Sequence, residues 1–481
     1  MRKRDRFFMT QVMKLIFQCF LYSFLFLVFF GLMSLNSPAI LNLSRTAGTT
    51  MATFVLSMTL FTKVYGGFDI GRRKKRSVFS SITLAIFFTD LITYLMLQIM
   101  NTNPNNPEAN PTFQFWGEDL ALLFAAFLVQ LMIIYLLVSL GIYFYHRINP
   151  PQKCCIITSS QQMAEHVLSK TLGMQEMFAF TDVIHYTCPD WRETVKGHDV
   201  IFIAGVPDTE EAALEAYCYK HHKTIYLQAE LEDVIKSTAE QNVLDDTAFL
   251  NIHRNEMTLI QRVIKRGADI VISLIGLIIT SPITLVTAAV LKMQGYGSVF
   301  FRQARATING NIFKIIKFRT MYEDSAANVS AAQNDSRVTP VGRFLRKYRI
   351  DELPQLINVL KGEMSLVGPR PEMLENVVKY IQEVPEFRYR QQMKAGLTGL
   401  AQIEGKYNTS PQDKAILDLL YIENFSILYD FKLILRTATI FFRKDSTEGF
   451  GTQKVSCPSI RMEAKEVKEP KCAGRERKDR A

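Results

Sequence analysis

Two adjacent carboxylates, Asp351 and Glu352, lie in the stretch RIDELPQLINVLKGEMSLVGPRP at residues 349–371. Pro354 fits only the first turn of a helix, because a proline in a helix interior removes a hydrogen bond. The carboxylates therefore mark the start of a helix, whose positive end keeps them ionised and also attracts phosphate. An ionised aspartate beside a bound phosphate can act as a nucleophile, and a neighbouring glutamate can bind Mg²⁺. An acidic N-cap on a surface helix is the alternative interpretation.

An arginine held between two prolines favours the first interpretation. Pro369 and Pro371 restrict the backbone on both sides of Arg370. The guanidinium is therefore presented at a low entropic cost, and its fork matches two phosphate oxygens. A plain surface turn is the alternative. Further basic residues surround this stretch, and some of them must face lipid headgroups instead of a substrate; they include Lys317, Arg319 and Arg349.

The residue types that are missing from the C-terminal part narrow the chemistry further. All seven histidines precede Arg254, and no cysteine occurs between Tyr219 and Ser456. This part therefore has no histidine base and no cysteine nucleophile of its own. The chain also has no Asp-x-Asp motif. Carboxylates among many cations are suited to phosphoryl transfer, in which cations neutralise phosphate oxygens and a carboxylate attacks or holds a metal ion.

Four long apolar runs in the first third predict a membrane bundle, since each has nearly the length of about 20 residues that spans a bilayer. The N-terminus begins with RKRDR and the second loop contains RRKKR, whereas residues 101–119 have no lysine or arginine. By the positive-inside rule, the N-terminus and everything after the fourth run are cytoplasmic. A soluble four-helix bundle is the alternative. The runs cover residues 15–35, 47–64, 78–100 and 120–145.

A fifth apolar run, residues 268–291, has Ser281-Pro282 at its middle and basic residues on both flanks. Proline breaks the helical hydrogen-bond ladder, and positive charge on both sides indicates that both ends stay cytoplasmic. We therefore predict a re-entrant helix-break-helix over residues 265–292, where the Ser281 hydroxyl bonds backbone groups that the break sets free.

Between the membrane parts, residues 150–253 predict a Rossmann-like α/β domain. CCIIT at 154–158, DVIFIAGV at 199–206 and TIYLQ at 224–228 are typical of buried parallel strands. The turn after the first of them reads TSSQQ and lacks the glycines of a dinucleotide-binding loop. We therefore expect a structural or regulatory domain.

Composition agrees with a basic membrane protein in a reducing compartment. Hydrophobic residues make up 48% of the 481 residues and the formal net charge is +10. Anionic lipid accounts for the basic charge, and no nucleic-acid-binding pattern is present. The seven cysteines are scattered without a C-x-x-C pair, which argues against a disulfide framework. The tail after Thr452 is charged and predicted to be disordered.

Several motifs of the C-terminal part, taken in order, resemble those of a known family. KRGADI, the Ser281-Pro282 break, KFRTM at 317–321, the stretch from Arg349 and GLTGLAQIEG at 396–405 occur in the order typical of monotopic phosphoglycosyl transferases, the bacterial sugar transferases that act on polyprenyl phosphate. The layout of four spans and an α/β domain resembles the large galactose- and glucose-1-phosphate transferases. The resemblance is strong over about the last 40% of the chain.

The resemblance implies a two-step reaction. Asp351 would attack a UDP-sugar and release UMP, and undecaprenyl phosphate would then take the phosphosugar; Glu352 would hold Mg²⁺ and Arg370 would clamp phosphate. This is the first step of exopolysaccharide, capsule or O-antigen repeat-unit synthesis, on the cytoplasmic face of the bacterial inner membrane. Leu400 replaces the family's usual tryptophan, and Lys406, near the expected nucleotide side, replaces an arginine.

The predicted fold is thus a multi-domain membrane protein with a four-helix transmembrane bundle, a Rossmann-like α/β domain and a mostly helical α/β catalytic domain with a re-entrant helix. A non-catalytic scaffold of polysaccharide assembly remains the alternative function, and a homo-oligomer is compatible with the sequence. The expected domains are residues 1–149, 150–253, 254–450 and a tail at 451–481.

Overall fold

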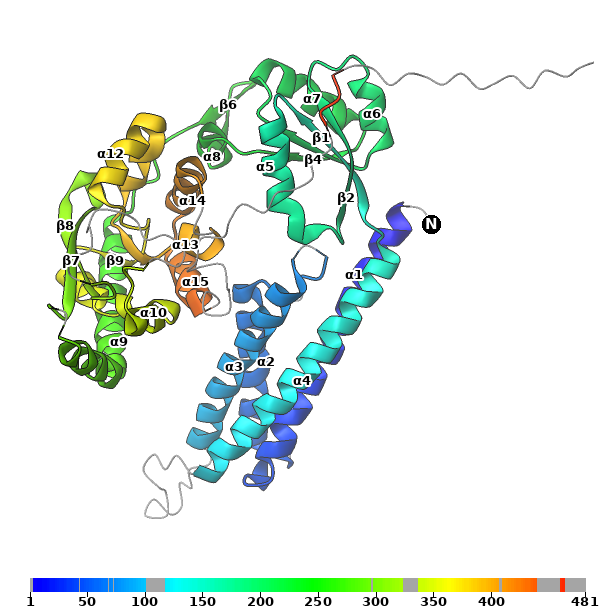
Figure 1. The fold of residues 1–481 in the computed structure, drawn as a ribbon. Helices are drawn as coiled ribbons and strands as arrows, with labels where there is room; N and C mark the ends of the chain where they lie inside the picture. Colours follow the sequence, from blue (N-terminus) through cyan, green and yellow to red (C-terminus); the bar gives the residue numbers. More distant parts are fainter. Residues whose placement is uncertain are drawn as a thin grey trace, which may run out of the picture. The chain divides into compact units, whose positions relative to one another are not determined.

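The chain forms two compact units (Figure 1). One consists of Met1–Tyr145 with Ala229–Thr452, and the other of His146–Gln228 with Gln453–Ala481. A computed structural model describes residues 3–42, 44–67, 69–71, 73–100, 117–295, 297–322, 336–405, 409–438 and 459–462.

The N-terminal helices of the first unit pack around one apolar core. Leu21, Phe54, Ile82 and Ile134, one from each helix, are almost fully buried in it. A polar contact also crosses this bundle, because Gln130 donates a hydrogen bond of 3.3 Å to a carboxylate oxygen of Asp90. The helices are α1 (Lys3–Met33), α2 (Arg45–Tyr65), α3 (Lys75–Met100) and α4 (Gly117–Ile148).

Four helices of the described chain are long and apolar enough to cross a membrane. Three are predicted spans, and the fourth contains the predicted re-entrant run. Helix α2 covers the predicted span 47–64 but is not among them. It is rich in threonines, whose hydroxyls bond carbonyls one turn earlier, as between Thr50 and Thr46 at 2.7 Å. The four segments are Phe8–Met33, Lys75–Met100, Glu118–Ile148 and Leu259–Met293.

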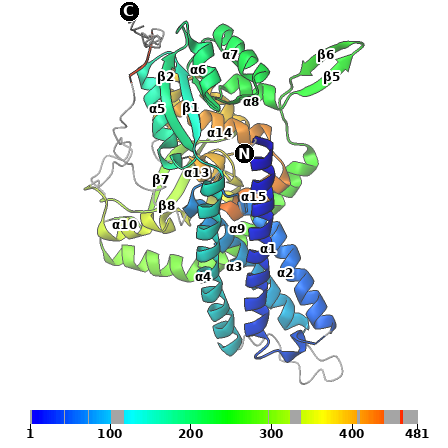
Figure 2. The same ribbon diagram turned by 90° about the vertical axis from the view of Figure 1, so that its right-hand side faces the viewer.

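Helix α9 (Leu259–Met293) is continuous, with Pro282 inside it, so the predicted interruption of the helix is absent. Figures 1 and 2 show a bend instead, as is typical of a helix that contains proline. Proline leaves the carbonyl of Ile278, four residues earlier, without its backbone donor. The hydroxyl of Ser281 donates to that carbonyl at 2.7 Å, as predicted. This bond helps to keep the helix intact across the proline.

The N-terminal half of α9 is anchored to the rest of the first unit by buried charges. Lys265 pairs with Asp430 and donates to the carbonyl of Val367 at 3.0 Å. One carboxylate oxygen of Asp269 accepts from the backbone N–H of Leu366 at 2.9 Å. These contacts hold α9 against the strand that leads into the Pro-Arg-Pro turn.

The remainder of this unit is mostly helical. Two small sheets, antiparallel β7–β8 and parallel β9–β10, lie among its helices. The hairpin β5–β6 is exposed along its whole length (Figure 2). The elements are α8 (Leu231–Ser237), β5 (Glu240–Leu244), β6 (Thr247–Asn251), β7 (Phe300–Ala306), β8 (Ile312–Phe318), α10 (Pro340–Lys347), α11 (Gln355–Lys361), β9 (Ser365–Val367), α12 (Leu374–Glu383), β10 (Gly396–Thr398), α13 (Leu400–Glu404), α14 (Pro411–Glu423) and α15 (Ile427–Thr437).

The second unit contains a four-stranded parallel sheet in the order β2-β1-β3-β4. The three predicted strands are present, and β2 is a fourth at the edge. After β1, Ser160 caps the next helix by accepting from the N–H of Met163 at 3.3 Å. The elements are β1 (Gln152–Thr158), α5 (Gln161–Thr171), β2 (Phe178–His185), α6 (Trp191–Gly197), β3 (Val200–Ala204), α7 (Asp208–Lys220) and β4 (Thr224–Leu227).

The two compact units do not follow the expected domains one to one, and the expected domains remain a prediction. Helix α8 belongs to the first unit, because Val234 packs against Leu419 of α14. Most of the tail predicted to be disordered lies outside the described residues. Its described part, 459–462, runs beside β2, where the N–H of His185 donates to the carbonyl of Arg461 at 3.0 Å.

Candidate active site

The Asp-Glu pair lies in a tight turn between two helices. Ile350–Glu352 form a single 3₁₀ turn, and Pro354 is the N-cap of α11. The chain enters this turn through Arg349, which has a left-handed backbone (φ 54°). Such a conformation costs a non-glycine residue of order 1–3 kcal/mol and is concentrated at functional sites. The predicted position of the two carboxylates just before a helix is confirmed.

Glu352 is surrounded by cations. One carboxylate oxygen accepts from Lys317 Nζ at 3.1 Å and from Arg370 Nη2 at 3.0 Å, and the other accepts from Arg349 Nη1 at 3.3 Å. Burial alone would raise the pKa of Glu352. The three positive charges outweigh it and hold this pKa well below its usual value. Glu352 is therefore a permanent anion that draws three predicted phosphate ligands together.

Asp351 is the opposite case. It is buried, and among the described residues none donates a hydrogen bond to its carboxylate. Burial and the neighbouring charge of Glu352 raise the pKa of Asp351 to about 6, although Lys317, Arg346 and Arg349 act against the shift. Two adjacent carboxylates in such different states are a common arrangement for dividing chemical roles. Asp351 has the carboxylate that is left available for a substrate.

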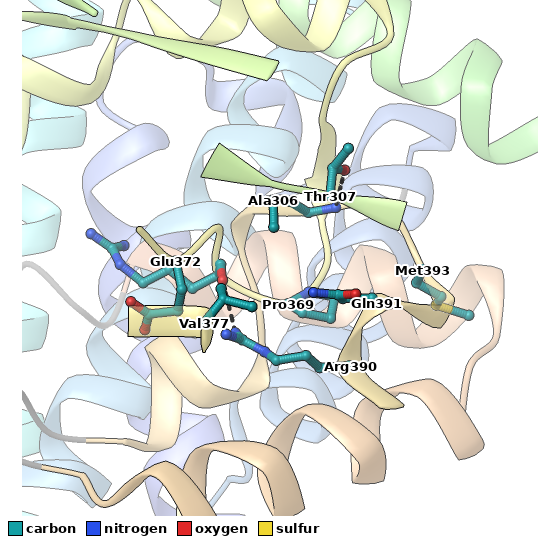
Figure 3. A pocket seen from close by; sticks show the side chains of 10 residues that line it. Ala306, Thr307, Pro369, Glu372, Val377, Arg390, Gln391 and Met393 are labelled. Carbon is teal, nitrogen blue, oxygen red and sulfur yellow. Dashed lines mark hydrogen bonds between the residues drawn. The ribbon is translucent and has the colours of Figure 1, made fainter. Parts of the chain in front are cut away.

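The Pro-Arg-Pro turn is supported by a second, fully buried layer. Arg390 Nη2 donates to the carbonyl of Arg370 at 2.7 Å (Figure 3). Arg390 also forms an ion pair with Asp418 at 2.7 Å, and both side chains are at most 5% exposed. The carbonyl of Pro369 accepts from the N–H of Gly396 at 2.8 Å. The turn is therefore held by its backbone, while the Arg370 side chain remains 40% exposed.

Close packing explains the glycines of this region. A Cβ on Gly368 would lie 2.2 Å from the carbonyl oxygen of Lys394, and a Cβ on Gly396 would lie 2.1 Å from the nitrogen of Gly368. Neither position has room for a side chain. The glycines of VGPRP and GLTG thus allow β9 and β10 to place the Pro-Arg-Pro turn beside the Asp-Glu turn.

One predicted ligand is not part of this arrangement. Arg319 is buried and donates to the carbonyl of Leu291, near the end of α9, at 3.2 Å. Its role toward a substrate remains a prediction. Lys406 lies outside the described residues.

Comparison with known proteins identifies the group to which this arrangement belongs. A sequence model of the family described as bacterial sugar transferase matches residues 260–444. A UDP-glucose:undecaprenyl-phosphate glucose-1-phosphate transferase from Caulobacter vibrioides is 39% identical over 189 residues, which are 38% of this chain and 71% of that protein. The chain belongs to the bacterial sugar transferase family.

Other relatives of this bacterial sugar transferase are similar in kind. A UDP-N-acetylgalactosamine-undecaprenyl-phosphate N-acetylgalactosaminephosphotransferase from Aeromonas hydrophila is 33% identical over 277 residues, 54% of this chain and 64% of that protein. A UDP-glucose:undecaprenyl-phosphate glucose-1-phosphate transferase from Escherichia coli is 40% identical over 212 residues, 43% of this chain and 45% of that protein. The alignments thus span roughly half to two thirds of these relatives' lengths.

A Mg²⁺ ion at the Asp-Glu turn of this bacterial sugar transferase remains a prediction. In the described part of the chain, no cluster of three histidine, cysteine or acidic side chains could hold a metal ion. The turn supplies two carboxylates, and the oxygens of Glu352 already accept from three cations. Mg²⁺ commonly takes one or two carboxylates, several waters and substrate phosphate oxygens. Asp351 and Glu352 are thus the carboxylates at this turn that would bind such an ion.

Sequence reasoning missed the residues that support the site from a distance. Arg390 and Asp418 are 28 positions apart, and neither stands in a motif that predicts the pair. Arg305 and Gln355 also lie beside the predicted cations and were not expected there.

Proposed function

We propose that the protein transfers a sugar 1-phosphate from a UDP-sugar to undecaprenyl phosphate and releases UMP, the starting step of a bacterial surface glycan. The observation that supports this most is the contrast between Asp351 and Glu352. Asp351 has a raised pKa and accepts no hydrogen bond from the described residues, whereas Glu352 binds three cations at the same turn. A non-catalytic scaffold would have no use for that contrast. The names of the relatives supply the substrate class.

The mechanism follows from what each residue can do. The ionised Asp351 carboxylate attacks the β-phosphorus of the UDP-sugar, and the bond from that phosphorus to the bridging oxygen breaks. The electron pair leaves on UMP, and an aspartyl phosphosugar remains. A phosphate oxygen of the lipid then attacks the same phosphorus and returns the carboxylate to Asp351. Arg370 and Lys317 neutralise phosphate oxygens in both steps.

Mg²⁺ held by Glu352 would neutralise the diphosphate when bound. The three cations and the metal ion would then share the two carboxylate oxygens of Glu352. Arg370 is the most exposed of the three cations, with 40% of its side chain accessible against 19% for Lys317 and 22% for Arg349. It is therefore the one that can most easily turn from Glu352 to a phosphate.

The test is a mass measurement on the full-length protein. Mixing it with a panel of UDP-sugars and no lipid should give UMP and a phosphosugar adduct that maps to Asp351. Asp351→Asn should abolish the adduct and lower turnover by several orders of magnitude. The exposed Glu383 gives a matched control, because Glu383→Gln should change neither. An adduct at another residue excludes the assignment. Normal turnover without any adduct indicates direct transfer between the two substrates.

We also propose that α9 enters the membrane and returns to the cytoplasmic side, so that the second unit and the site face the cytoplasm. The buried Lys265 and Asp269 support this, because their contacts with the site region hold one half of α9 on the protein side. The bend of α9, which contains Pro282, supports a return. Cysteines introduced at the exposed positions Leu259 and Met293 should both be labelled from the cytoplasmic side only. Labelling of position 293 from outside would contradict the re-entrant arrangement.

A further inference from the structure

A small hollow lies beside the Asp-Glu turn, on one side of the Pro-Arg-Pro turn. Its volume is about 300 Å³, including space open to solvent. Lys317 and Arg370, which both bind Glu352, form part of its wall, and no acidic side chain lines it in the described part of the chain. The proposed mechanism uses these two cations. It leaves unexplained two other polar side chains that line the hollow, Arg305 and Gln355.

Among the described residues, no carboxylate forms an ion pair with Arg305. Its Nη2 donates to the side-chain oxygen of Gln303 at 2.7 Å, and its Nη1 makes a long contact of 3.4 Å with the carbonyl of Pro371. Its Nε is buried and has no acceptor. Burial lowers the pKa of Arg305 to about 10, and Arg370 adds to that shift, although the charges of Glu372, Glu375 and Glu352 act against it. Arg305 is half-buried, and the carboxylates whose charges act on it form no ion pair with it among the described residues, so an anion in the hollow would be its direct partner.

Gln355 provides a second hydrogen-bond donor that lacks an acceptor among the described residues. It is the first residue of α11, three positions after Glu352, and only 3% of it is exposed. Its amide Nε2 is buried without an acceptor. A buried donor that lacks a partner costs free energy comparable to that of a lost hydrogen bond. A water molecule could accept from it, but only an anion would also neutralise Arg305.

The chemistry of such an anion is well defined. It must carry negative charge and offer several acceptor oxygens to donors that converge from β7, β8, α11 and the Pro-Arg-Pro turn. Phosphate has these properties and binds arginine by charge-assisted hydrogen bonds. We propose that Arg305 and Gln355 bind a phosphate group next to the phosphorus that reacts at Asp351. The identity of the phosphate rests on the proposed function.

Two substrates could supply this phosphate, and they share its chemistry. In the first step it is the phosphate that leaves with the nucleoside as UMP. In the second step it is the phosphate of the lipid acceptor. Since the two occupy the site in turn, one subsite next to Asp351 would serve either or both.

The experiment measures binding without turnover, on the full-length protein in detergent. Equilibrium titrations with inorganic phosphate, UMP and uridine would be compared for wild type and Arg305→Gln. We expect phosphate and UMP to bind roughly ten- to hundredfold more weakly to the variant, the loss expected for a charged hydrogen-bonding partner. The affinity for uridine should not change. Arg302 on the same strand is exposed and provides the matched control, since Arg302→Gln should leave all three affinities unchanged.

Further variants keep the test decisive. Should Arg305→Gln unfold, Gln355→Glu keeps the size of the side chain and places a negative charge in the hollow, and it should weaken phosphate and UMP binding in the same way. The KM values for UDP-sugar and for undecaprenyl phosphate then tell which substrate uses the subsite. Unchanged phosphate and UMP affinities in both variants would overturn the proposal. A further outcome is that the variants bind phosphate and UMP more weakly while the wild-type protein forms no phosphosugar adduct. That result would support the subsite and contradict only the proposed reaction.

Discussion

The site region of the first unit and the sheet of the second unit bury very different side chains. Around the site, Asp351, Arg390 and Asp418 are all buried. In the described part of the second unit, the sheet buries apolar residues, cysteines and Thr158, and His198 at the end of α6 is the single buried histidine or charged residue. Burying a charge costs several kcal/mol unless the charge is well paired.

The difference indicates where ligands act. An apolar core is accounted for by its contribution to folding stability. Buried charges lower that stability unless they are well paired, and they occur where they hold groups in place for binding or catalysis. In the first unit, Asp351, Arg390 and Asp418 belong to the Asp-Glu turn or support the Pro-Arg-Pro turn, whereas the buried Asp90 and Arg319 lie outside this arrangement. The sheet shows no comparable constellation among its described residues, and its first turn has a serine cap where a dinucleotide site would need glycines.

The largest expected effect comes from breaking the buried Arg390–Asp418 ion pair, which supports the Pro-Arg-Pro turn. Arg390→Met leaves Asp418 buried and unpaired, which should destabilise the first unit by about 3–5 kcal/mol. It also removes the donor to the carbonyl of Arg370, so UMP release should fall. The double variant Arg390→Met/Asp418→Leu should recover most of the stability but not the activity. Thermal melting and UMP release measure the two effects separately.

The exposed pair Lys379–Glu383, with a distance of 3.7 Å, provides the control. Lys379→Met should change stability by less than about 1 kcal/mol, since exposed ion pairs contribute little. Full activity in the double variant would show that Arg390 has no positioning role and only neutralises Asp418.

The comparison also shows which features the sequence could predict. Asp351, Glu352 and Arg370 were predictable, because they stand close together and prolines restrict their backbone. The Arg390–Asp418 pair was not, since only the tertiary fold brings α14 beneath the Pro-Arg-Pro turn. The same holds for the hollow, where Arg305 and Gln355 meet from separate elements.

The fold had similar limits. The apolar runs predicted helices and buried strands correctly, but β2 (FAFTDVIH) was not expected, because an edge strand with threonine and aspartate lacks a continuous apolar pattern. Proline in α9 predicted a break, and the structure has a bent, continuous helix. The local sequence determines that α9 loses one backbone hydrogen bond at Pro282. Packing along the helix decides whether that loss ends the helix.

An intermediate effect is expected from pH, and it tests the contrast between Asp351 and Glu352. Only the ionised carboxylate attacks, and the pKa of Asp351 is raised to about 6. The rate of adduct formation should therefore be half-maximal near pH 6, level off about one pH unit above it and fall about tenfold per pH unit well below it. Glu352→Gln removes the neighbouring negative charge, so the midpoint of its slower reaction should move to lower pH. Rapid-quench measurements across pH 4.5–8 give both profiles, and a flat wild-type profile down to pH 5 would contradict the assignment.

The smallest effect on turnover should come from the sheet of the second unit. Arg461 bonds Asp190 at 2.9 Å and Thr194 at 2.8 Å, and its backbone carbonyl accepts from the N–H of His185 at the edge of β2. Arg461→Ala removes two partly buried contacts, which should loosen this edge by about 1–2 kcal/mol. Hydrogen exchange at the His185 amide should then be roughly tenfold faster, because local opening becomes easier. UMP release should stay within about twofold of wild type, since this edge bears no part of the proposed site. A larger loss of activity would mean that the second unit acts on the reaction, and that the absence of buried charge in its described sheet is no guide to its role.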